Sequence, residues 1–156
     1  MSKQWQIRRG TAAENDIFTG AQGEVTMCTD TNELRVHDGV TQGGFEVPVL
    51  VAVQRPTADN GYTWYRKYSD GWVEQGGFYD KGSIVTDWPS LTVAYPITMA
   101  DTNYVLLTQA GRNNADTTKI NNQSFIISRT INAFIAEVYG DGGSQFLWWQ
   151  VSGMAA

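Results

Sequence analysis

The sequence has little of what most catalytic, metal-binding and membrane proteins contain. Its 156 residues include one cysteine and one histidine. A single cysteine excludes an intramolecular disulfide framework, and we expect Cys28 to pack as a small hydrophobe in an alternating stretch. A nucleophilic cysteine needs a basic neighbour that lowers its thiol pKa, and no pattern brings His37 beside it. The longest apolar run, residues 49–53, is far too short to cross a bilayer, so we expect no membrane insertion.

Charge is also scarce. Charged residues make up 17% of the chain and the formal net charge is −5. The Lys and Arg residues form no basic patch or stripe, which argues against a nucleic-acid partner. We interpret the pair Arg8-Arg9 as a solvated strand edge rather than a phosphate site. A hydrophobic fraction of 42% beside this low charge is typical of a globular protein.

One short helix is predicted, and the rest of the chain indicates an all-β protein. Thr11 can cap a helix with Glu14 three residues later, as in a capping box, and Thr19-Gly20 ends it after about two turns. Alternating apolar and polar residues before position 48 predict short strands at 4–9, 24–29 and 34–37. Turn-forming residues separate them at 29–32, 38–39 and 43–44.

A change of composition suggests two domains. Residues 54–61 are polar and contain Pro and Gly, so we expect a linker there. A small N-terminal β module would then span residues 1–53, and an aromatic-rich second domain residues 62–156. Strands in that second domain are predicted at 62–68, 71–79, 91–97, 103–109, 123–129, 131–139 and 145–152. So many short strands separated by Gly and Asn favour a β-sandwich or open barrel.

The N-terminal module is too small to be stable by its own core. Residues 1–48 offer few sizeable apolar side chains, and so small a domain rarely buries enough surface alone. With no disulfide available, oligomerisation is the remaining remedy. The run at 49–53 has no polar face and needs cover on all sides, either on the axis of a multimer or against the second domain.

Two pairs of side chains resemble fragments of active sites, and we interpret both as structural. Asp70 and Glu74 could form the carboxylate pair of a glycan hydrolase, but on a strand they are about 13 Å apart at ~3.3 Å per residue. His37 and Asp38 could begin a dyad or a metal site, yet the chain has no second histidine and Asp38-Gly39 is typical of a turn.

The glycine-rich stretches at 39–44 and 140–143 lack the Lys-Ser/Thr pair of phosphate-binding loops. We therefore predict no catalytic residue, no metal ligand and no cofactor, so that the protein is not an enzyme.

Two long polar loops, at 111–122 and 139–144, are the candidate binding surface. Loops on a rigid β scaffold often carry recognition residues, and amide, hydroxyl and carboxyl groups can pair with sugar hydroxyls. A plain connecting hairpin is the alternative for residues 111–122. The candidate binding residues are Asn113, Asn114, Asp116, Tyr139 and Asp141.

The tryptophans give further expectations. Trp148 and Trp149 are adjacent, so on a strand they face opposite sides. One should pack in the sandwich core and the other at a subunit contact, where Trp is enriched, or alternatively serve as a glycan platform. Trp72 follows the turn at 69–71, and we expect its side chain to be mostly buried.

Three segments in fixed order resemble a phage module. They are Ile7–Glu14 with its RRGT opening, Phe18–Val25 with Gly-Glu before a strand, and Leu34–Gly44 with His-Asp-Gly before a Gly-Gly turn. Together they resemble the N-terminal domain of the phage major tropism determinant, which recurs in tail-fibre proteins. The segments Tyr65–Gly77 and Phe146–Gly153 resemble C-terminal domains of phage tail fibres. That resemblance implies a trimeric β-sandwich at the distal tip of a fibre.

The resemblance implies a receptor-binding tail-fibre protein that attaches a phage to a bacterial surface through a glycan or another receptor. It also implies a homotrimer in the virion, with other tail or baseplate proteins as partners. Because residues 1–5 contain no apolar signal segment, we expect the chain to fold in the bacterial cytoplasm. The alternatives are a structural tail or assembly protein without receptor contact, and an enzyme acting on surface polysaccharide.

Overall fold

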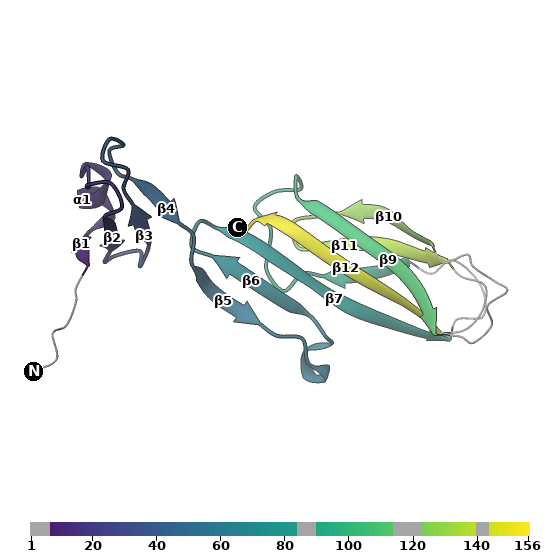
Figure 1. Ribbon diagram of the computed structural model, residues 1–156. Coiled ribbons are helices and arrows are strands. Elements are labelled where there is room, and N and C mark those ends of the chain that lie inside the picture. The colour runs from purple at the N-terminus through teal and green to yellow at the C-terminus, as the bar shows by residue number, and fades with distance from the viewer. Residues whose placement is uncertain (1–6, 84–89, 114–122, 140–143) are drawn as a thin grey trace, which may run out of the picture. The chain divides into compact units, whose positions relative to one another are not determined.

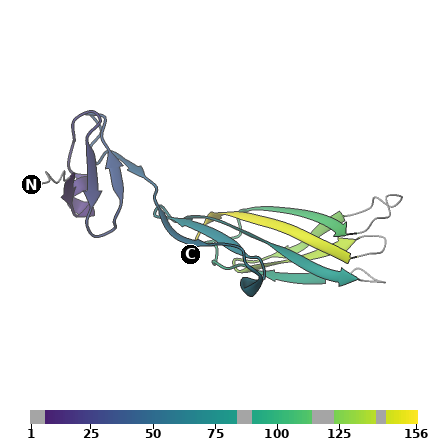
Figure 2. The same ribbon diagram turned by 60° about the horizontal axis from the view of Figure 1, so that its bottom comes forward.

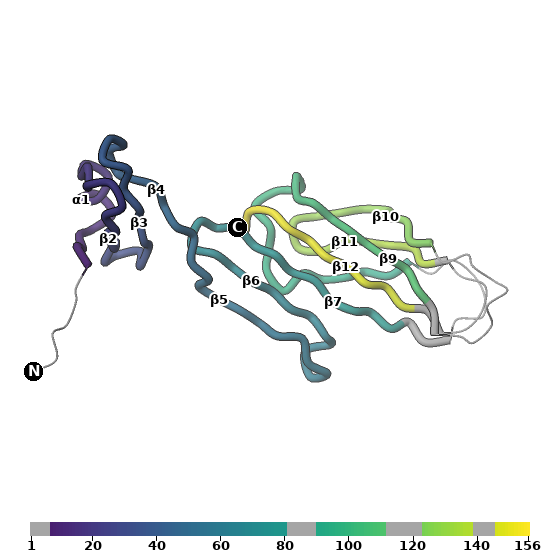
Figure 3. The backbone as a smooth tube through the Cα atoms, viewed as in Figure 1, coloured from purple at the N-terminus to yellow at the C-terminus, as the bar shows by residue number. Residues whose placement is uncertain are grey.

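The chain is described by a computed structural model that covers residues 7–83, 90–113, 123–139 and 144–156. It divides into two compact units (Figure 1). The first unit contains residues 1–50 and 68–70, and the second contains residues 51–67 and 71–156. Figure 3 traces the backbone path through both of them.

The first unit is a small sheet with one short helix. Its sheet order is β1-β2-β3-β4, in which β1 runs parallel to β2 and the other pairs are antiparallel. The elements are β1 (Arg8–Gly10), α1 (Ala12–Asp16), β2 (Val25–Cys28), β3 (Leu34–Val36) and β4 (Phe45–Val47).

The predicted helix and its cap are confirmed. The backbone N–H of Glu14 donates to the Thr11 hydroxyl (3.3 Å), and the Thr11 N–H donates to the Glu14 carboxylate (2.7 Å). These reciprocal bonds satisfy two N–H groups that the first helical turn would leave without partners. The predicted turns are confirmed as well, because Asn32, Gly39 and Gly43 adopt positive φ.

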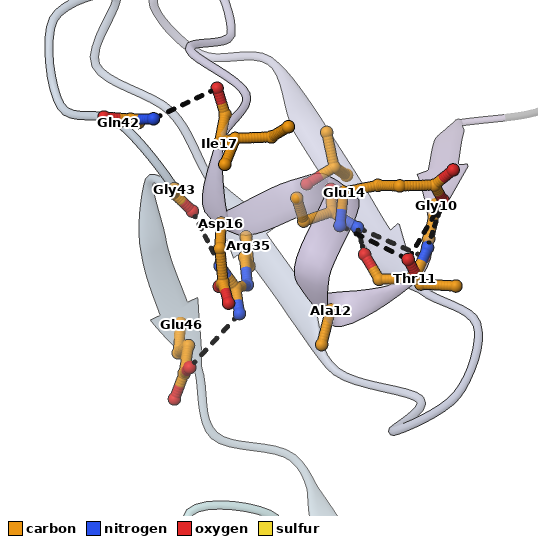
Figure 4. A network of polar contacts seen from close by, with 12 residues as sticks. Gly10, Thr11, Ala12, Glu14, Asp16, Ile17, Arg35, Gln42, Gly43 and Glu46 are labelled. Atoms are coloured by element: carbon orange, nitrogen blue, oxygen red, sulfur yellow. Dashed lines mark hydrogen bonds and ion pairs between the residues drawn. The ribbon is translucent and has the colours of Figure 1, made fainter.

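The interior of the first unit is polar. Cys28 is fully buried, as predicted, and the other buried side chains here are Asn15, Thr26, Arg35 and His37. The Arg35 guanidinium donates to Asp16 (2.6 Å), the Gly43 carbonyl (3.2 Å) and Glu46 (3.5 Å), as Figure 4 shows. Polar contacts therefore replace much of the hydrophobic core that the sequence lacks, although the buried Nε of Arg35 has no hydrogen-bond partner among the described residues.

The second unit is a β-sandwich, and the strands predicted after residue 62 are confirmed. One sheet has the order β5-β6-β7-β12-β9 and the other the order β10-β11-β8. The strands are β5 (Leu50–Gln54), β6 (Trp64–Tyr68), β7 (Trp72–Ser83), β8 (Ser90–Ala94), β9 (Val105–Asn113), β10 (Gln123–Arg129), β11 (Ala133–Tyr139) and β12 (Ser144–Met154). A 3₁₀ turn, η1 (Ala58–Asn60), joins β5 to β6. Residues 54–61, expected as an interdomain linker, thus lie within the second unit.

The sandwich core lies between the two sheets (Figure 2). Its aromatic centre is Tyr95, whose ring is 5.8 Å from Trp149 and 5.9 Å from Phe134. The Tyr95 hydroxyl donates to Tyr104 (3.0 Å), which donates to the Thr130 carbonyl (2.8 Å). Burial and this hydrogen bond raise the pKa of the Tyr95 hydroxyl.

The register of β7 and β12 decides which tryptophans are buried. Val73 pairs with Gly153 and faces the core, so its neighbour Trp72 faces outward and is 39% exposed. The prediction that Trp72 is mostly buried is therefore wrong, because the next residue, Val73, takes the core-facing position. The prediction that Trp148 and Trp149 face opposite sides, with one of them in the core, is confirmed, since Trp149 is 5% exposed and Trp148 is 52% exposed.

The apolar segment at 49–53 forms an edge strand. Leu50, Val51 and Val53 of β5 remain 50%, 53% and 53% exposed, respectively. Pairing with β6 in the sheet therefore leaves these apolar side chains exposed.

Candidate binding sites

The predicted loop residues lie at one end of the second unit, as far as the structure describes them. Asn113 ends β9 and Tyr139 ends β11. Asn113 pairs with Ser144 at the start of β12, and Tyr139 pairs with Gln123 at the start of β10. These strand ends gather at the same end of the sandwich (Figures 1 and 2). Asn114, Asp116 and Asp141 lie outside the described residues.

A second candidate site, which the sequence did not predict as a unit, lies on the outer face of the five-stranded sheet. Alternate residues of β7 and β12 face the core, so Phe78 and Trp148 point the other way. With Tyr62, Trp64 and Tyr79 they line a hollow of about 780 Å³, which we call the aromatic groove. The remaining lining residues are Pro56, Gly61, Gly77 and Asp80.

Rings of the aromatic groove form a row in which each ring contacts its neighbour. The Phe78 ring is 4.5 Å from Trp148 and 6.3 Å from Tyr62, which meets it edge-on. Phe146 supports this row from β12, 5.5 Å from Phe78. Contacts of this kind contribute about 0.5–1.5 kcal/mol beyond simple burial and fix the orientation of the exposed rings.

Gly76 makes room for one wall of the groove. A Cβ atom there would lie 2.9 Å from the Trp64 ring and 2.6 Å from the Trp149 carbonyl oxygen. The Trp64 indole therefore lies directly against the backbone of β7, and no larger residue at position 76 would allow this packing.

Tyr62 adopts a backbone conformation that is rare for its residue type. Its φ is 58°, in the left-handed region, directly after Gly61 at φ 64°. A non-glycine residue in this region costs roughly 1–2 kcal/mol. Such strain persists where the surroundings enforce it and is often associated with function.

The loop before β6 enforces the position of Tyr62. The Tyr62 N–H donates to the Thr57 carbonyl (2.8 Å). The Asn60 side chain accepts from the Thr57 N–H (2.9 Å) and donates to the Arg55 carbonyl (2.8 Å). Gln54 donates to the Thr63 carbonyl (3.2 Å) on the other side. These bonds hold the exposed Tyr62 ring at the rim of the groove.

A smaller hollow of about 390 Å³ lies beside the aromatic groove, and both are lined by Trp64 and Trp148. Gln109 of β9 and Gln150 of β12 give it a polar lining, whereas the hydroxyl of Thr108 bonds to Ser124 of β10 (3.0 Å). Trp148 thus borders an aromatic hollow and a polar one.

His37 and Asp38, which resembled part of an active site, both make hydrogen bonds within the first unit. The His37 ring is buried; its Nδ1 accepts from the Gly20 N–H (3.2 Å) and its Nε2 bonds to the Thr26 hydroxyl (3.0 Å). Asp38 closes a turn, where the backbone N–H groups of Thr41 and Val40 lower the pKa of its carboxyl to about 2.

In the second unit, Glu74 makes an ion pair with Arg66 (3.9 Å). The described part of the chain contains no cluster of three His, Cys, Asp or Glu residues that could hold a metal ion. Nor does it contain a helix long and apolar enough to span a membrane.

Partial signals for the aromatic groove are present in the sequence. Trp148 was predicted to face away from its neighbour, with a glycan platform as one alternative. Tyr62, Trp64 and Phe78 belong to the aromatic-rich stretch that opens the second domain. What the sequence did not show is that β12 pairs with β7, which brings Trp148 beside Phe78.

Comparisons with known proteins bear on the first unit. Residues 6–41 match the family model of the major tropism determinant N-terminal domain. A stretch of 45 residues is 53% identical to a tail fiber receptor-binding protein of Bordetella phage BPP-1, covering 29% of this chain and 12% of that protein. The chain therefore matches only a small part of this relative, and the predicted resemblance to phage tail-fibre proteins is confirmed there.

Solved structures of pyocin tail fibres are similar in part. An N-truncated R1-type pyocin tail fiber aligns over 65% of this chain and 84% of its own, with 16% identity and a TM-score of 0.48. The R1 pyocin fiber of P. aeruginosa, comprising its C-terminal residues, aligns over 58% of this chain and 26% of its own, with 12% identity and a TM-score of 0.48.

Proposed function

We propose that this chain is a receptor-binding protein of a phage tail fibre, a virion component that attaches the phage to its bacterial host without catalysis. The observation that carries the proposal is the 53% identity between a stretch of 45 residues of this chain and a tail fiber receptor-binding protein. The match spans only 12% of that relative, so it does not indicate which receptor this chain binds. We therefore infer the class of receptor from the second unit of this chain.

The first unit serves attachment and self-association in this proposal. Ile17, Phe45 and Val47 are 73%, 56% and 38% exposed on a unit whose interior is polar. Apolar side chains left outside so small a core favour association, and we propose a homotrimer that also contacts other tail or baseplate proteins. Three copies would turn weak receptor contacts into avid attachment.

The second unit carries the receptor contacts, and the proposed receptor is a surface glycan. Its support is the end of the sandwich where Asn113 and Tyr139 lie, with Asn114, Asp116 and Asp141 in the same loops by sequence. The amide, carboxyl and phenol groups of these residue types can exchange hydrogen bonds with sugar hydroxyls. The exposed aromatic groove adds a flat apolar surface on the same unit.

The test is adsorption of the fluorescently labelled, full-length chain to a panel of bacterial strains, read by flow cytometry. We expect saturable binding to a subset of strains. Mild periodate, which cleaves vicinal diols of sugars, should remove the binding, whereas protease treatment of the cells should not. A receptor that resists periodate but not protease would contradict the glycan and retain the receptor-binding role. Absence of binding to every strain would favour the structural alternative.

A further inference from the structure

The aromatic groove combines features of a built ligand site. The rings of Tyr62, Trp64, Phe78 and Trp148 stand around a hollow of about 780 Å³, within the range of small-ligand pockets. Trp148 is 52% exposed and Tyr62 is 50% exposed, so their faces are available to a ligand. A pocket with mostly apolar walls and a few polar groups binds a ligand that has both kinds of surface.

The strained backbone at Tyr62 is a second, independent observation. Loop closure alone does not require a tyrosine there, because glycine or asparagine adopts positive φ more readily. The loop nevertheless presents the tyrosine ring edge-on to Phe78 at the rim of the groove. The strain is therefore best explained by the position in which it holds the ring.

The charge of the lining selects among ligands. Asp80 is the only charged residue among those that line the aromatic groove in the described part of the chain. None of the described lining residues carries a positive charge that would attract a phosphate, a nucleic acid or an acidic sugar. The amide side chains of Gln109 and Gln150 line the polar hollow that adjoins Trp148. Planar amides pair with hydroxyl groups through both a donor and an acceptor.

We propose that the aromatic groove binds an uncharged pyranose of the host surface glycan, with the C–H face of the sugar stacked on Trp148. The neighbouring residue of the glycan extends over Trp148 toward Gln109 and Gln150, which take its hydroxyls. This assignment rests on the proposed receptor-binding function and names the ligand class and a site for it that is separate from the loop residues.

The experiment measures binding of methyl glycosides to the full-length protein by saturation-transfer NMR. The probes are neutral methyl hexosides and N-acetylhexosaminides, with a methyl glucuronide as the anionic comparison. We expect transfer to the ring C–H protons of at least one neutral glycoside and weaker transfer to the glucuronide. Trp148→Ala should weaken that binding about tenfold or more, as loss of a central aromatic anchor does.

Trp72→Ala is the matched control. Trp72 is also exposed on the outer face of this sheet, but it does not line the groove, so its removal should leave glycoside binding unchanged. Tyr62→Gly is the second groove variant, because glycine keeps the loop backbone while it removes the ring. Tyr62→Gly should weaken glycoside binding. It therefore tests the groove in case Trp148→Ala is poorly folded.

Several outcomes would overturn the inference. One is that no neutral glycoside binds the wild type, and another is that both groove variants bind as the wild type does. A third is that Trp148→Ala lowers the oligomeric mass, which would assign the groove to a second copy of the chain.

The proposed function is tested separately by adsorption of the same proteins to cells. Adsorption that persists in both groove variants removes the groove as a receptor site and leaves the function standing. Failure of the wild type to adsorb removes the function itself, whatever the glycosides show.

Discussion

The left-handed backbone at Tyr62 predicts an inverted order of stability between two small residues. At ordinary positions glycine is less stable than alanine by roughly 0.5–1 kcal/mol, because its unfolded chain has more freedom. At φ 58° the left-handed backbone conformation destabilises an alanine by roughly 1–2 kcal/mol, whereas it does not destabilise a glycine. Tyr62→Gly should therefore be more stable than Tyr62→Ala by about 0.5–1 kcal/mol, which is roughly 2–6 °C in Tm for a unit of this size.

Both variants lose the same ring contact with Phe78, so their difference isolates the backbone term. The assay is thermal unfolding followed by circular dichroism, at one fixed protein concentration. Tyr79 on β7 provides the control pair, since it is 41% exposed and has no positive φ. There Tyr79→Ala should be the more stable variant. If Tyr62→Ala equalled or exceeded Tyr62→Gly, the strain at Tyr62 and the inference drawn from it would be refuted.

Three further predictions concern the rest of the chain. Thr11→Ala removes the cap of α1 and should lower the unfolding free energy of the first unit by about 1 kcal/mol in urea titrations, whereas Thr11→Ser should retain most of it. Asp38 has a folded pKa of about 2 against an ordinary value of 3.8, so its stabilising effect is present above pH 4 and is lost as the pH falls toward 2. Asp38→Asn should flatten that part of the Tm–pH profile, and an unchanged profile would contradict the turn contacts. Trp149→Ala should cost about 3–5 kcal/mol as a buried ring, and Trp72→Ala much less, which the two unfolding midpoints will compare.

Local signals in the sequence were enough to predict the elements. The capping box at Thr11 and Glu14 depends on residues three apart, and the turn at Asp38-Gly39 on two neighbours, so both could be read directly. The strands after residue 62 follow from alternation between turn residues. Trp72 shows the limit, because alternation gives two faces but does not say which of them meets the core.

Sheet order and long-range pairing could not be predicted in this way. The aromatic groove exists because β12 inserts between β7 and β9, although these strands are far apart in sequence. That pairing places Trp148 opposite Phe78. The polar interior of the first unit was equally hidden, since Arg35 and His37 alternate with Leu34 and Val36, and alternation does not say which set is buried. Only the arrangement of three partners around Arg35 makes its burial favourable.

In the proposed trimer, other copies of the chain cover the exposed apolar residues of each unit. Val51 and Val53 on β5, and Phe45 on β4, are each more than half exposed in the single chain. Native mass spectrometry should give a species of about three times the 17.3 kDa chain. A stable, folded monomer at micromolar concentration would contradict the proposal that these residues are covered by other copies.

The central claim is that this chain recognises a receptor on bacterial cells. Its most direct test is an adsorption isotherm of the purified wild-type protein on a strain that it binds, repeated with polysaccharide extracted from that strain and from a strain that it does not bind. We expect saturable adsorption that the first polysaccharide inhibits and the second does not. Adsorption that neither saturates nor responds to either polysaccharide would contradict specific glycan recognition.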